Sequence, residues 1–315
     1  MSLKLRLQLS LLVFTAMATT GNSLLLAGQR VLVTGAGRGI GQAIAQLCHE
    51  QGANVAICAR TATQLQETAQ QLTWAPPSSE KPEYDDDDNE KVPSLRRVLS
   101  YTVDVTQPDQ VKDMVTSIVQ TWGGIDVLIN NAGRGQAHKG NLTELSSSDF
   151  TDLLQLNVVA VHTVTAAVVP YMKEASSSSL CQIINVSSKA GKVGLPNMSH
   201  YVASKFAVEG LTASWASELQ SHNIRVNSIS PGMVNTVSFP KPSGRPGVRT
   251  AASIADGLFL LLAHSNVTGC YVHVDELDLV RSRGLPDERA LKSINEVNFA
   301  DTLEAQDGDG QCSQT

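Results

Sequence analysis

VLVTGAGRGIG, residues 31–41, joins a short apolar run to a helix-like segment through four closely spaced glycines. Glycine lets the backbone turn sharply and approach a ligand closely, because it carries no Cβ. The helix that follows begins with free N–H groups and a positive dipole end, which suit the pyrophosphate of a dinucleotide. The stretch departs from the pattern G-x-G-x-x-G at Ile40, which takes the place of the third glycine. With a strand before it and a helix after it, the stretch predicts a dinucleotide site that includes Gly35, Gly39, Ile40 and Gly41.

From Arg30 onward the chain alternates short apolar runs with helix-like segments such as 40–51 and 107–122. We expect strands at Val31–Val33, Asn54–Ala59, Val98–Val103, Ile125–Asn130, Gln182–Val186, Ile224–Ile229 and Cys270–Val274. Several of these runs are apolar throughout, which is typical of parallel strands covered on both faces. The alternation predicts an α/β fold: one doubly wound parallel sheet of the Rossmann type, with about seven strands, in a single domain. Ligands bind such a sheet at the edge where the carboxyl ends of its strands gather.

Three regions break the alternation and set the expected domain organisation. Residues 1–28 place Lys4 and Arg6 before an apolar stretch, which is typical of a targeting or anchor segment; an amphipathic extension is the alternative. This segment favours the secretory pathway, the endoplasmic reticulum or another organelle over the cytoplasm, and allows membrane association. Residues 74–95 form an acidic, proline-rich insertion, which we interpret as a solvated loop. Residues 286–315 read as a polar tail, and residues 29–285 are left as the cofactor-binding domain.

Composition narrows the possible partners. The net charge of −6 and an aromatic content of 4% argue against a nucleic-acid partner. The five cysteines form no C-x-x-C pair, and an odd number fits poorly with a disulfide framework. We interpret them as mainly buried free thiols. Since the histidines do not cluster with the cysteines, the sequence predicts no metal site.

The end of the second strand indicates which dinucleotide binds. Enzymes that use NAD usually place an acidic residue there, on the ribose 2′-hydroxyl. The sequence here is Cys58-Ala59-Arg60, without a carboxylate. Arg60 and Arg38 suit a 2′-phosphate instead, so we predict NADP(H) over NAD(H). The alternative is that both arginines are solvated surface charges.

Two further strand ends are candidates for cofactor contact. Asp104 and Val105 follow the third strand, where the adenine amino group is expected. Asn131, Ala132 and Gly133 follow the fourth strand, where small residues let a cofactor ribose lie against the backbone. Ordinary turn chemistry is the alternative for either segment alone.

Tyr201 and Lys205 are four positions apart, which places them on one face of a helix. A lysine ammonium nearby favours the phenolate and is expected to lower the pKa of the tyrosine toward neutral pH. Ser188 ends the fifth strand, and Asn157 lies in the apolar helix before that strand. A buried asparagine needs hydrogen-bond partners, and local satisfaction within the helix is the alternative for Asn157.

Taken together, these motifs resemble those of the single-domain short-chain dehydrogenase/reductase family, from about residue 30 to residue 275. The matching features are T-G-x-x-x-G-x-G at 34–41, N-N-A-G at 130–133, the set Asn157, Ser188, Tyr201 and Lys205, and the stretch from Pro231-Gly232 to Thr236. The resemblance implies that the four-residue set is the catalytic tetrad, with Tyr201 and Lys205 also contacting the cofactor. It implies nicotinamide contacts from Pro231, Gly232, Val234 and Thr236, and a homodimer or homotetramer. Residues 236–251, where relatives usually carry a substrate lid, are short here, which leaves the substrate open.

The function that follows is that of an NADPH-dependent reductase, which transfers a hydride between the nicotinamide and a carbonyl or alcohol substrate. Ser188 would hydrogen-bond the substrate oxygen, Tyr201 would exchange its proton, and Lys205 would support the tyrosine and the ribose hydroxyls. Asn157 would hold a water that relays protons to Lys205. A non-catalytic NADP(H) sensor or scaffold is the alternative. Within the enzyme interpretation, a 3-oxoacyl thioester, a steroid or retinoid, and a xenobiotic ketone all remain candidates.

Overall fold

The computed structural model of the protein describes residues 24–72, 98–176, 180–236, 247–263 and 268–274. Most of the expected N-terminal segment, the acidic insertion at 74–95 and the tail at 286–315 lie outside these ranges. Of residues 236–251, where a substrate lid was expected, only residue 236 and residues 247–251 are described. The short strand β8 (Val248–Arg249) in this region pairs with β7 (Met233–Val234), which precedes the region.

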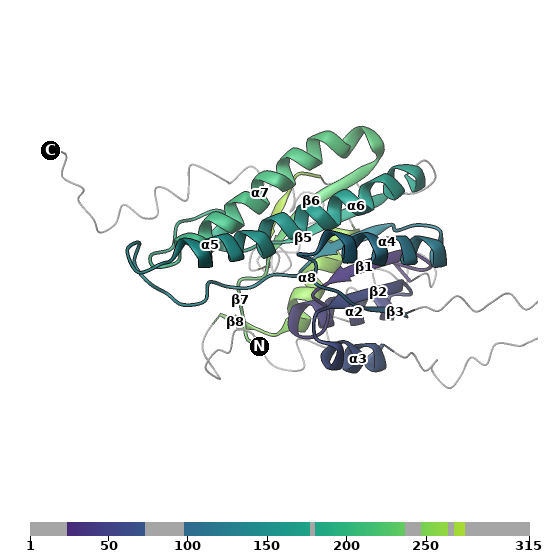
Figure 1. The fold of residues 1–315 in the computed structure, drawn as a ribbon. Coiled ribbons are helices and arrows are strands. Elements are labelled where there is room, and N and C mark those ends of the chain that lie inside the picture. Colours follow the sequence, from purple (N-terminus) through teal and green to yellow (C-terminus); the bar gives the residue numbers. More distant parts are fainter. Residues whose placement is uncertain (1–23, 73–97, 177–179, 237–246, 264–267, 275–315) are drawn as a thin grey trace, which may run out of the picture.

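A seven-stranded sheet, parallel throughout, forms the centre of the molecule (Figure 1). Its strand order is β3-β2-β1-β4-β5-β6-β9. The strands are β1 (Arg30–Thr34), β2 (Asn54–Ala59), β3 (Val98–Thr102), β4 (Val127–Asn130), β5 (Cys181–Val186), β6 (Ile224–Ser230) and β9 (Tyr271–His273). The predicted fold is confirmed, and the expected strands differ from these only by one or two residues at their ends.

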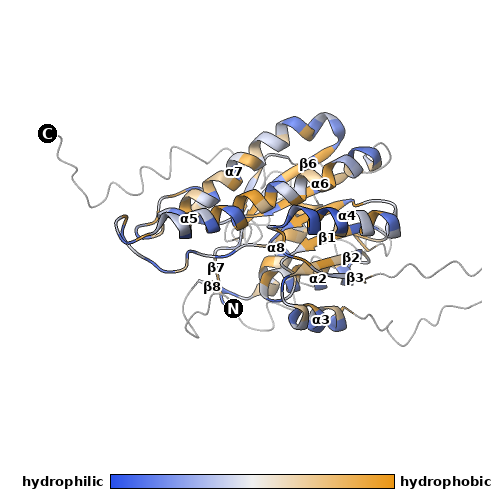
Figure 2. Cartoon of the chain, in the orientation of Figure 1, coloured by the Kyte–Doolittle hydropathy of each residue, from blue (hydrophilic) through white to orange (hydrophobic). Residues whose placement is uncertain are grey.

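Helices cover both faces of the sheet. One face carries α2 (Gly39–Glu50), α3 (Ala62–Gln71) and α8 (Ala251–Ala263), and the other carries α4 (Pro108–Trp122), α6 (Ala160–Ala175) and α7 (Ser199–Leu219). Figure 2 shows the apolar residues concentrated in the strands and α8, with polar residues on the outward faces of α3 and α4. The described cysteines, Cys48, Cys58, Cys181 and Cys270, are free and buried, as expected. Burial raises the pKa of the Cys48 and Cys58 thiols to about 12.

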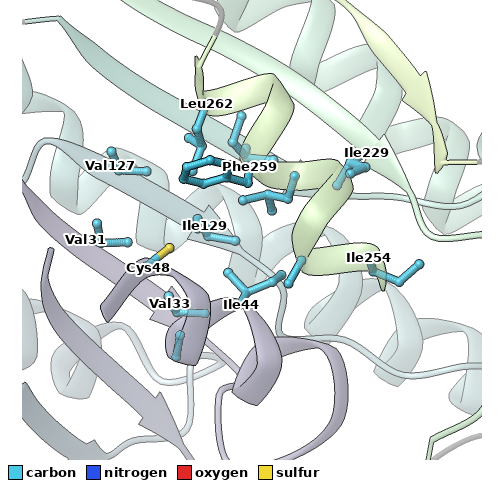
Figure 3. Close-up of a cluster of buried hydrophobic side chains, with 14 of the residues drawn as sticks. Val31, Val33, Ile44, Cys48, Val127, Ile129, Ile229, Ile254, Phe259 and Leu262 are labelled. Atoms are coloured by element: carbon cyan, nitrogen blue, oxygen red, sulfur yellow. The ribbon is translucent and has the colours of Figure 1, made fainter. Parts of the chain in front are cut away.

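Alternation along β1 divides the core into two layers. Val31 and Val33 pack toward α2 and α8, whereas Leu32 packs on the opposite face. Figure 3 shows the first layer, in which Phe259 of α8 lies over the strands and Ile44 of α2 lies beside them. Both faces of β1 are therefore buried, which explains why its central residues are all apolar.

The long helical run on the second face contains an interruption of helical geometry. α5 (Ser147–Leu154) continues into α6 through a π-helical turn, Gln155–Val159. The run Ser147–Ala175 is long and apolar enough to cross a membrane by length and composition. Within the fold, buried residues of this run, such as Val164 and Val168, pack into the core beside α4. The core position accounts for the apolar sequence.

The strand order places a ligand-binding crevice next to β1. Connections run outward from β1 to β2 and β3 on one side, and through β4 to β5 and β6 on the other. The segments after β1 and β4 therefore diverge at the carboxyl edge, where doubly wound sheets bind ligands. Every motif identified in the sequence follows the end of one of these strands or lies on a helix packed against them.

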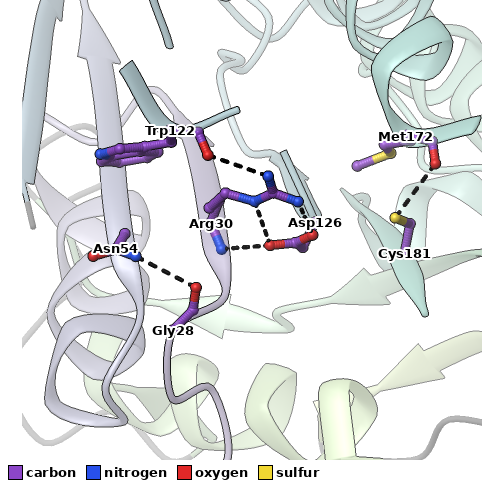
Figure 4. Close-up of polar contacts among 7 residues, drawn as sticks. All are labelled: Gly28, Arg30, Asn54, Trp122, Asp126, Met172 and Cys181. Atoms are coloured by element: carbon purple, nitrogen blue, oxygen red, sulfur yellow. Dashed lines mark hydrogen bonds and ion pairs between the residues drawn. The ribbon is translucent and has the colours of Figure 1, made fainter. Parts of the chain in front are cut away.

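An ion pair ties the opposite end of the sheet together (Figure 4). Arg30, at the start of β1, donates from Nη2 to Asp126 Oδ1 at 2.6 Å and from Nε to Oδ2 at 2.8 Å. The Arg30 backbone N–H donates to the same Oδ2 at 2.8 Å, and Nη1 donates to the Trp122 carbonyl at 3.2 Å. Hydrogen bonding to Asp126 raises the pKa of Arg30 above its usual value. Because Asp126 is 6% exposed, its carboxylate depends on these donors.

We predict that Asp126→Asn lowers the free energy of unfolding by about 2–3 kcal/mol, because Arg30 then loses its charged partner in a partly buried site. Urea denaturation of the two proteins measures the change. Asp113→Asn, on the exposed face of α4, is the matched control and should change stability by less than about 0.5 kcal/mol. A loss for Asp126→Asn no larger than the control would contradict the prediction.

Candidate active site

A cavity of about 420 Å³ opens at the carboxyl edge of the sheet. It is lined by residues that follow β1, β2, β3, β4, β5 and β6, and by residues of α7. The residues predicted from the sequence that line it are Gly35, Arg38, Gly39, Ile40, Gly41, Arg60, Val105, Asn131, Ala132, Gly133, Ser188, Tyr201, Lys205, Pro231, Gly232, Val234 and Thr236. The structure therefore brings both predicted halves of the site to one cavity. Asp104 and Asn157 are not among its lining residues.

The glycine loop after β1 is shaped by close contacts. Gly35 has a φ of +66°, and a Cβ at this position would lie 2.8 Å from the Ala132 Cα. A Cβ at Gly41 would overlap the Gly35 carbonyl and the Asn131 side chain. The helix α2 then begins at Gly39, without a side-chain hydrogen bond from its N-cap. This glycine-lined turn, opening onto an uncapped helix N-terminus, fits the pyrophosphate of a dinucleotide.

Asn131 holds this loop against the end of β4. Its Nδ2 donates to the Thr34 carbonyl at 2.9 Å and to the Gly35 carbonyl at 3.1 Å. The Thr34 hydroxyl accepts from the backbone N–H groups of Asn131 and Ala132, each at 3.0 Å. The side-chain amide of Asn131 is thus used within the protein, and its role is to position the glycine loop.

The charged side chains that line the cavity are all cationic. Its lining includes the cationic residues Arg38, Arg60, Arg134 and Lys205, and contains no aspartate or glutamate. Arg38 and Arg60 are exposed, and neither forms an ion pair within the described part of the chain. Such a lining favours a ligand that carries several negative charges.

Asp104 lies beside the cavity rather than on its surface. Its Oδ1 accepts hydrogen bonds from the Thr106 backbone N–H at 3.0 Å and from the Thr106 hydroxyl at 2.8 Å. One carboxylate oxygen is therefore used in a turn, while Val103 and Val105 on either side line the cavity. Adenine recognition by Asp104 stays a prediction.

Ser188, Tyr201 and Lys205, three residues of the expected tetrad, all line the cavity. Tyr201 and Lys205 lie on α7, and the Lys205 Nζ is 5.8 Å from the centre of the Tyr201 ring. The Lys205 Nζ donates to the Val186 carbonyl at 3.0 Å, which anchors it to the end of β5. The Ser188 hydroxyl accepts from the Ala190 N–H at 3.2 Å and also hydrogen-bonds the Tyr201 side chain. A phenol, a hydroxyl and an ammonium therefore lie close to one another in the cavity lining.

The expected effect of Lys205 on Tyr201 was wrong for this structure. Burial raises the pKa of Tyr201 above its usual value, and the hydrogen bond with Ser188 opposes that rise only in part. Burial also lowers the pKa of Lys205 to about 8, against an opposing effect of Glu209. Spacing along the helix was correctly interpreted, but it carries no information about desolvation, which dominates both groups.

Asn157 acts from behind the cavity. It lies in the π-helical turn and is 1% exposed. Its Oδ1 accepts from the Arg134 N–H at 3.0 Å, and its Nδ2 donates to the Arg134 carbonyl at 2.9 Å. The same Nδ2 donates to the Ser204 hydroxyl at 3.1 Å, and that hydroxyl donates to the Tyr201 carbonyl at 2.7 Å. Asn157 thus joins the segment after β4 to the helix that carries Tyr201.

A buried network of amides and hydroxyls supports the strand ends. The Asn130 Nδ2 donates to the Thr165 hydroxyl and to the Asn185 Oδ1, each at 2.9 Å. The Asn185 Nδ2 donates to the Thr212 hydroxyl at 2.9 Å. These four side chains link β4, β5, α6 and α7 directly below the site. Asn185, at the centre of this network, is fully buried.

Sequence reasoning missed several residues of the site. Gln136 accepts from the Tyr201 N–H at 3.3 Å, and Ser204 joins Asn157 to Tyr201. The cavity lining also includes Arg134 and the apolar residues Leu156, Leu195, Met198 and Met233. Ser204 could have been found from its place within the Tyr-x-x-Ser-Lys run, one residue before Lys205. The other contacts come from loops whose course no local pattern predicts.

Comparison with known proteins agrees with this geometry. Residues 29–243 match the family model for short chain dehydrogenases. The chain is 35% identical to the 3-oxoacyl-[acyl-carrier-protein] reductase FabG of Thermotoga maritima over 211 residues, which is 67% of this chain and 76% of that protein. It is 34% identical to an uncharacterized oxidoreductase of Staphylococcus aureus, over 65% of this chain and 78% of that protein.

Solved structures give the same result. A 3-ketoacyl-(acyl-carrier-protein) reductase from Brucella melitensis, complexed with NADH, superposes with a TM-score of 0.68 at 25% identity, over 79% of this chain and 97% of that one. Carveol dehydrogenase from Mycobacterium avium, in complex with NAD, superposes with a TM-score of 0.67 at 25% identity, over 79% and 96% of the two chains. The resemblance inferred from the motifs is confirmed: this chain belongs to the short-chain dehydrogenase family of oxidoreductases.

Proposed function

We propose that the protein is an NADPH-dependent reductase of a carbonyl substrate, with Tyr201 as the proton donor. The observation that carries the proposal is that Tyr201, Ser188 and Lys205 lie close together in one cavity, whose lining includes four cationic side chains and no carboxylate. The cavity suits a dinucleotide, because a glycine-lined turn and a helix N-terminus form one side of it. When bound there, the nicotinamide cofactor supplies the hydride.

The protein's own residues orient the substrate and move the proton. Negative charge grows on the substrate oxygen during reduction, and the Ser188 hydroxyl would donate a hydrogen bond to that oxygen. Tyr201 holds its proton at neutral pH because its pKa is raised, so it is poised as an acid in the direction of reduction. The Lys205 ammonium, anchored on the Val186 carbonyl, supports the negative charge that Tyr201 acquires on losing this proton.

The proposed preference for NADPH over NADH is inferred from two arginines, Arg60 at the end of β2 and Arg38. Arg60 follows β2 directly, Arg38 is the N-cap residue of α2, and both line the cavity. Both are cations without an ion-pair partner among the described residues, at the place where a ribose 2′-phosphate is expected. The two solved relatives hold NADH and NAD according to their titles. The phosphorylated cofactor is therefore inferred from these arginines alone.

The apolar part of the cavity lining favours an apolar substrate. Leu156, Leu195, Met198 and Met233 belong to that lining, so the group beside the carbonyl is expected to be hydrocarbon. The names of the Thermotoga and Brucella relatives make a 3-oxoacyl thioester the first substrate to test. Steroid or retinoid ketones and small xenobiotic ketones are the other candidates.

Replacing Tyr201 by Phe should lower kcat for carbonyl reduction by about 10²- to 10⁴-fold, because the phenolic proton is lost while the ring remains. The rate of NADPH consumption, over a panel of the three substrate classes, measures it. Tyr171→Phe on α6 is the matched control and should keep full activity. If the Tyr201→Phe variant preserved the protein's biological role in cells, a non-catalytic sensor or scaffold would be supported instead.

Removing either Arg38 or Arg60 should weaken NADPH binding by roughly tenfold or more, since each charged contact with the 2′-phosphate contributes about 1.5–3 kcal/mol. NADH binding should change little in the same variants. Fluorescence titration of both cofactors checks this, with Lys112→Ala on the exposed face of α4 as the control. A wild-type protein that binds NADH as tightly as NADPH would overturn the assignment.

The rate of reduction should fall as the pH rises through about 8. The lowered pKa means that Lys205 is charged below about 8 and neutral above it, whereas Tyr201 keeps its proton across this range. The decline should appear in kcat/KM, which reports groups of the free enzyme. A constant kcat/KM from about pH 7 to about pH 10 would show that the charge of Lys205 is not required.

A further inference from the structure

Glu209 is a buried carboxylate next to the catalytic lysine. It lies on α7 one turn after Lys205, so Tyr201, Lys205 and Glu209 recur every fourth residue along one side of the helix. Glu209 is 9% exposed and does not line the cavity. The predicted catalytic tetrad does not include Glu209 and gives no role to a carboxylate at this position.

The contacts of Glu209 leave part of its carboxylate unused. Its Oε2 accepts from the Ser228 hydroxyl of β6 at 2.9 Å and pairs with the Lys192 Nζ at 3.3 Å. Its Oε1 is buried and has no hydrogen-bond partner within the described residues. Burying a carboxylate oxygen without a hydrogen-bond donor costs free energy. A nearby cation offsets part of this cost, so the carboxylate of Glu209 can stabilise a neighbouring ammonium.

Gly191 packs closely against the part of α7 that carries Lys205 and Glu209. A Cβ at Gly191 would lie 2.9 Å from the Glu209 Cγ and 2.9 Å from the Lys205 carbonyl. It would also lie 3.1 Å from the Ser187 hydroxyl, another buried oxygen without a partner among the described residues. A residue without a side chain at 191 thus lets the turn after β5 close over this face of α7. The cluster is enclosed by β5, β6, α7 and the segment that carries Lys192.

Burial makes Lys205 sensitive to any nearby charge. The cavity side of Lys205 carries no carboxylate, and desolvation lowers the pKa of Lys205 to about 8. The influence that opposes desolvation is the charge of Glu209. An ammonium in low dielectric depends on such a partner far more than an exposed ammonium does.

We propose that Glu209 is a positioning residue for the reaction: its carboxylate keeps Lys205 in the charged form behind Tyr201, and Lys192 limits the strength of this effect. Lys192 has a half-exposed side chain, with 40% of its surface accessible, and its Nζ bridges from Glu209 to the Tyr271 ring, 4.7 Å from the ring centre. Because Lys192 neutralises part of the carboxylate charge, replacing Lys192 by a neutral residue should increase the stabilisation of charged Lys205 by Glu209. The proposal rests on the function proposed above.

The groups that face this cluster are few within the described residues. Around Glu209 they are Lys205 on its own helix, Lys192 after β5 and, beneath Lys192, Tyr271 of β9. β6 contributes the neutral Ser228. Around Lys205 they are Tyr201 and Glu209 on α7, with the Val186 carbonyl from β5. The two substitutions below therefore change the charge facing Lys205 in opposite directions.

The test measures the titration of Lys205 directly in the cofactor-free protein, by carbon NMR of the lysine Cε atoms. The signal is assigned with Lys205→Arg. In Glu209→Gln the midpoint should fall by about one pH unit, because a nearby opposite charge is removed. In Lys192→Met the midpoint should rise by a smaller amount. Glu218→Gln, an exposed carboxylate further along α7, is the matched control and should leave the midpoint unchanged.

The kinetic counterpart is the basic limb of kcat/KM for NADPH-dependent reduction, which should move in the same directions in the same variants. An unchanged Lys205 midpoint in Glu209→Gln would overturn the proposal. Should Glu209→Gln fail to fold, Lys192→Met decides alone: a raised midpoint supports the proposal, and an unchanged or lowered one overturns it. A wild-type protein without activity on any carbonyl would instead refute the proposed function, since the NMR titration does not depend on turnover.

Discussion

The attachment of the glycine loop to the end of β4 is the constraint on which the site depends. Asn131 donates to the carbonyls of Thr34 and Gly35, and Thr34 accepts from the first N–H groups after β4. These contacts fix the width of the crevice between two diverging connections of the sheet. A side chain at Gly35 or Gly41 would collide with the clamp itself, so the glycines are required as much by the protein's own packing as by the phosphates. The N-terminus of α2 is aimed by the same contacts.

The fold could be predicted from the sequence because its signals are local and repeated. Strands that are buried on both faces are largely apolar, as β2 and β5 are, and their bounds were found within one residue. The glycine loop showed where the first strand ends and the first helix begins. Because this loop follows β1, it indicated that the site forms at the carboxyl edge of the sheet. The positions of Ser188, Tyr201 and Lys205 followed from the same logic, because a strand end and a helical spacing of four are both visible in a single chain.

What the sequence did not reveal depends on side-chain contacts between distant segments. Nothing in the local pattern shows that Asn157 lies in a π-helical turn, or that its amide joins Arg134 to Ser204. Such a turn shifts the phase of a helix by one residue, so helical periodicity alone misplaces the side chain that it carries. Similarly, the spacing of Tyr201 and Lys205 predicted proximity but gave the wrong sign for the pKa of the tyrosine. Burial decides that sign, and burial is a property of the assembled fold.

Burial of Tyr201 and Lys205 has two opposing effects on the site. In the proposed reaction, burial of Tyr201 and Lys205 excludes water from the reacting groups, but it also disfavours the charged form of Lys205. A carboxylate on the cavity surface would restore that charge, yet it would repel an anionic dinucleotide. Placing Glu209 one helical turn behind Lys205, outside the cavity lining, separates the two requirements. Under this proposal Lys205 has a buried counter-charge, while the cavity lining contains no aspartate or glutamate.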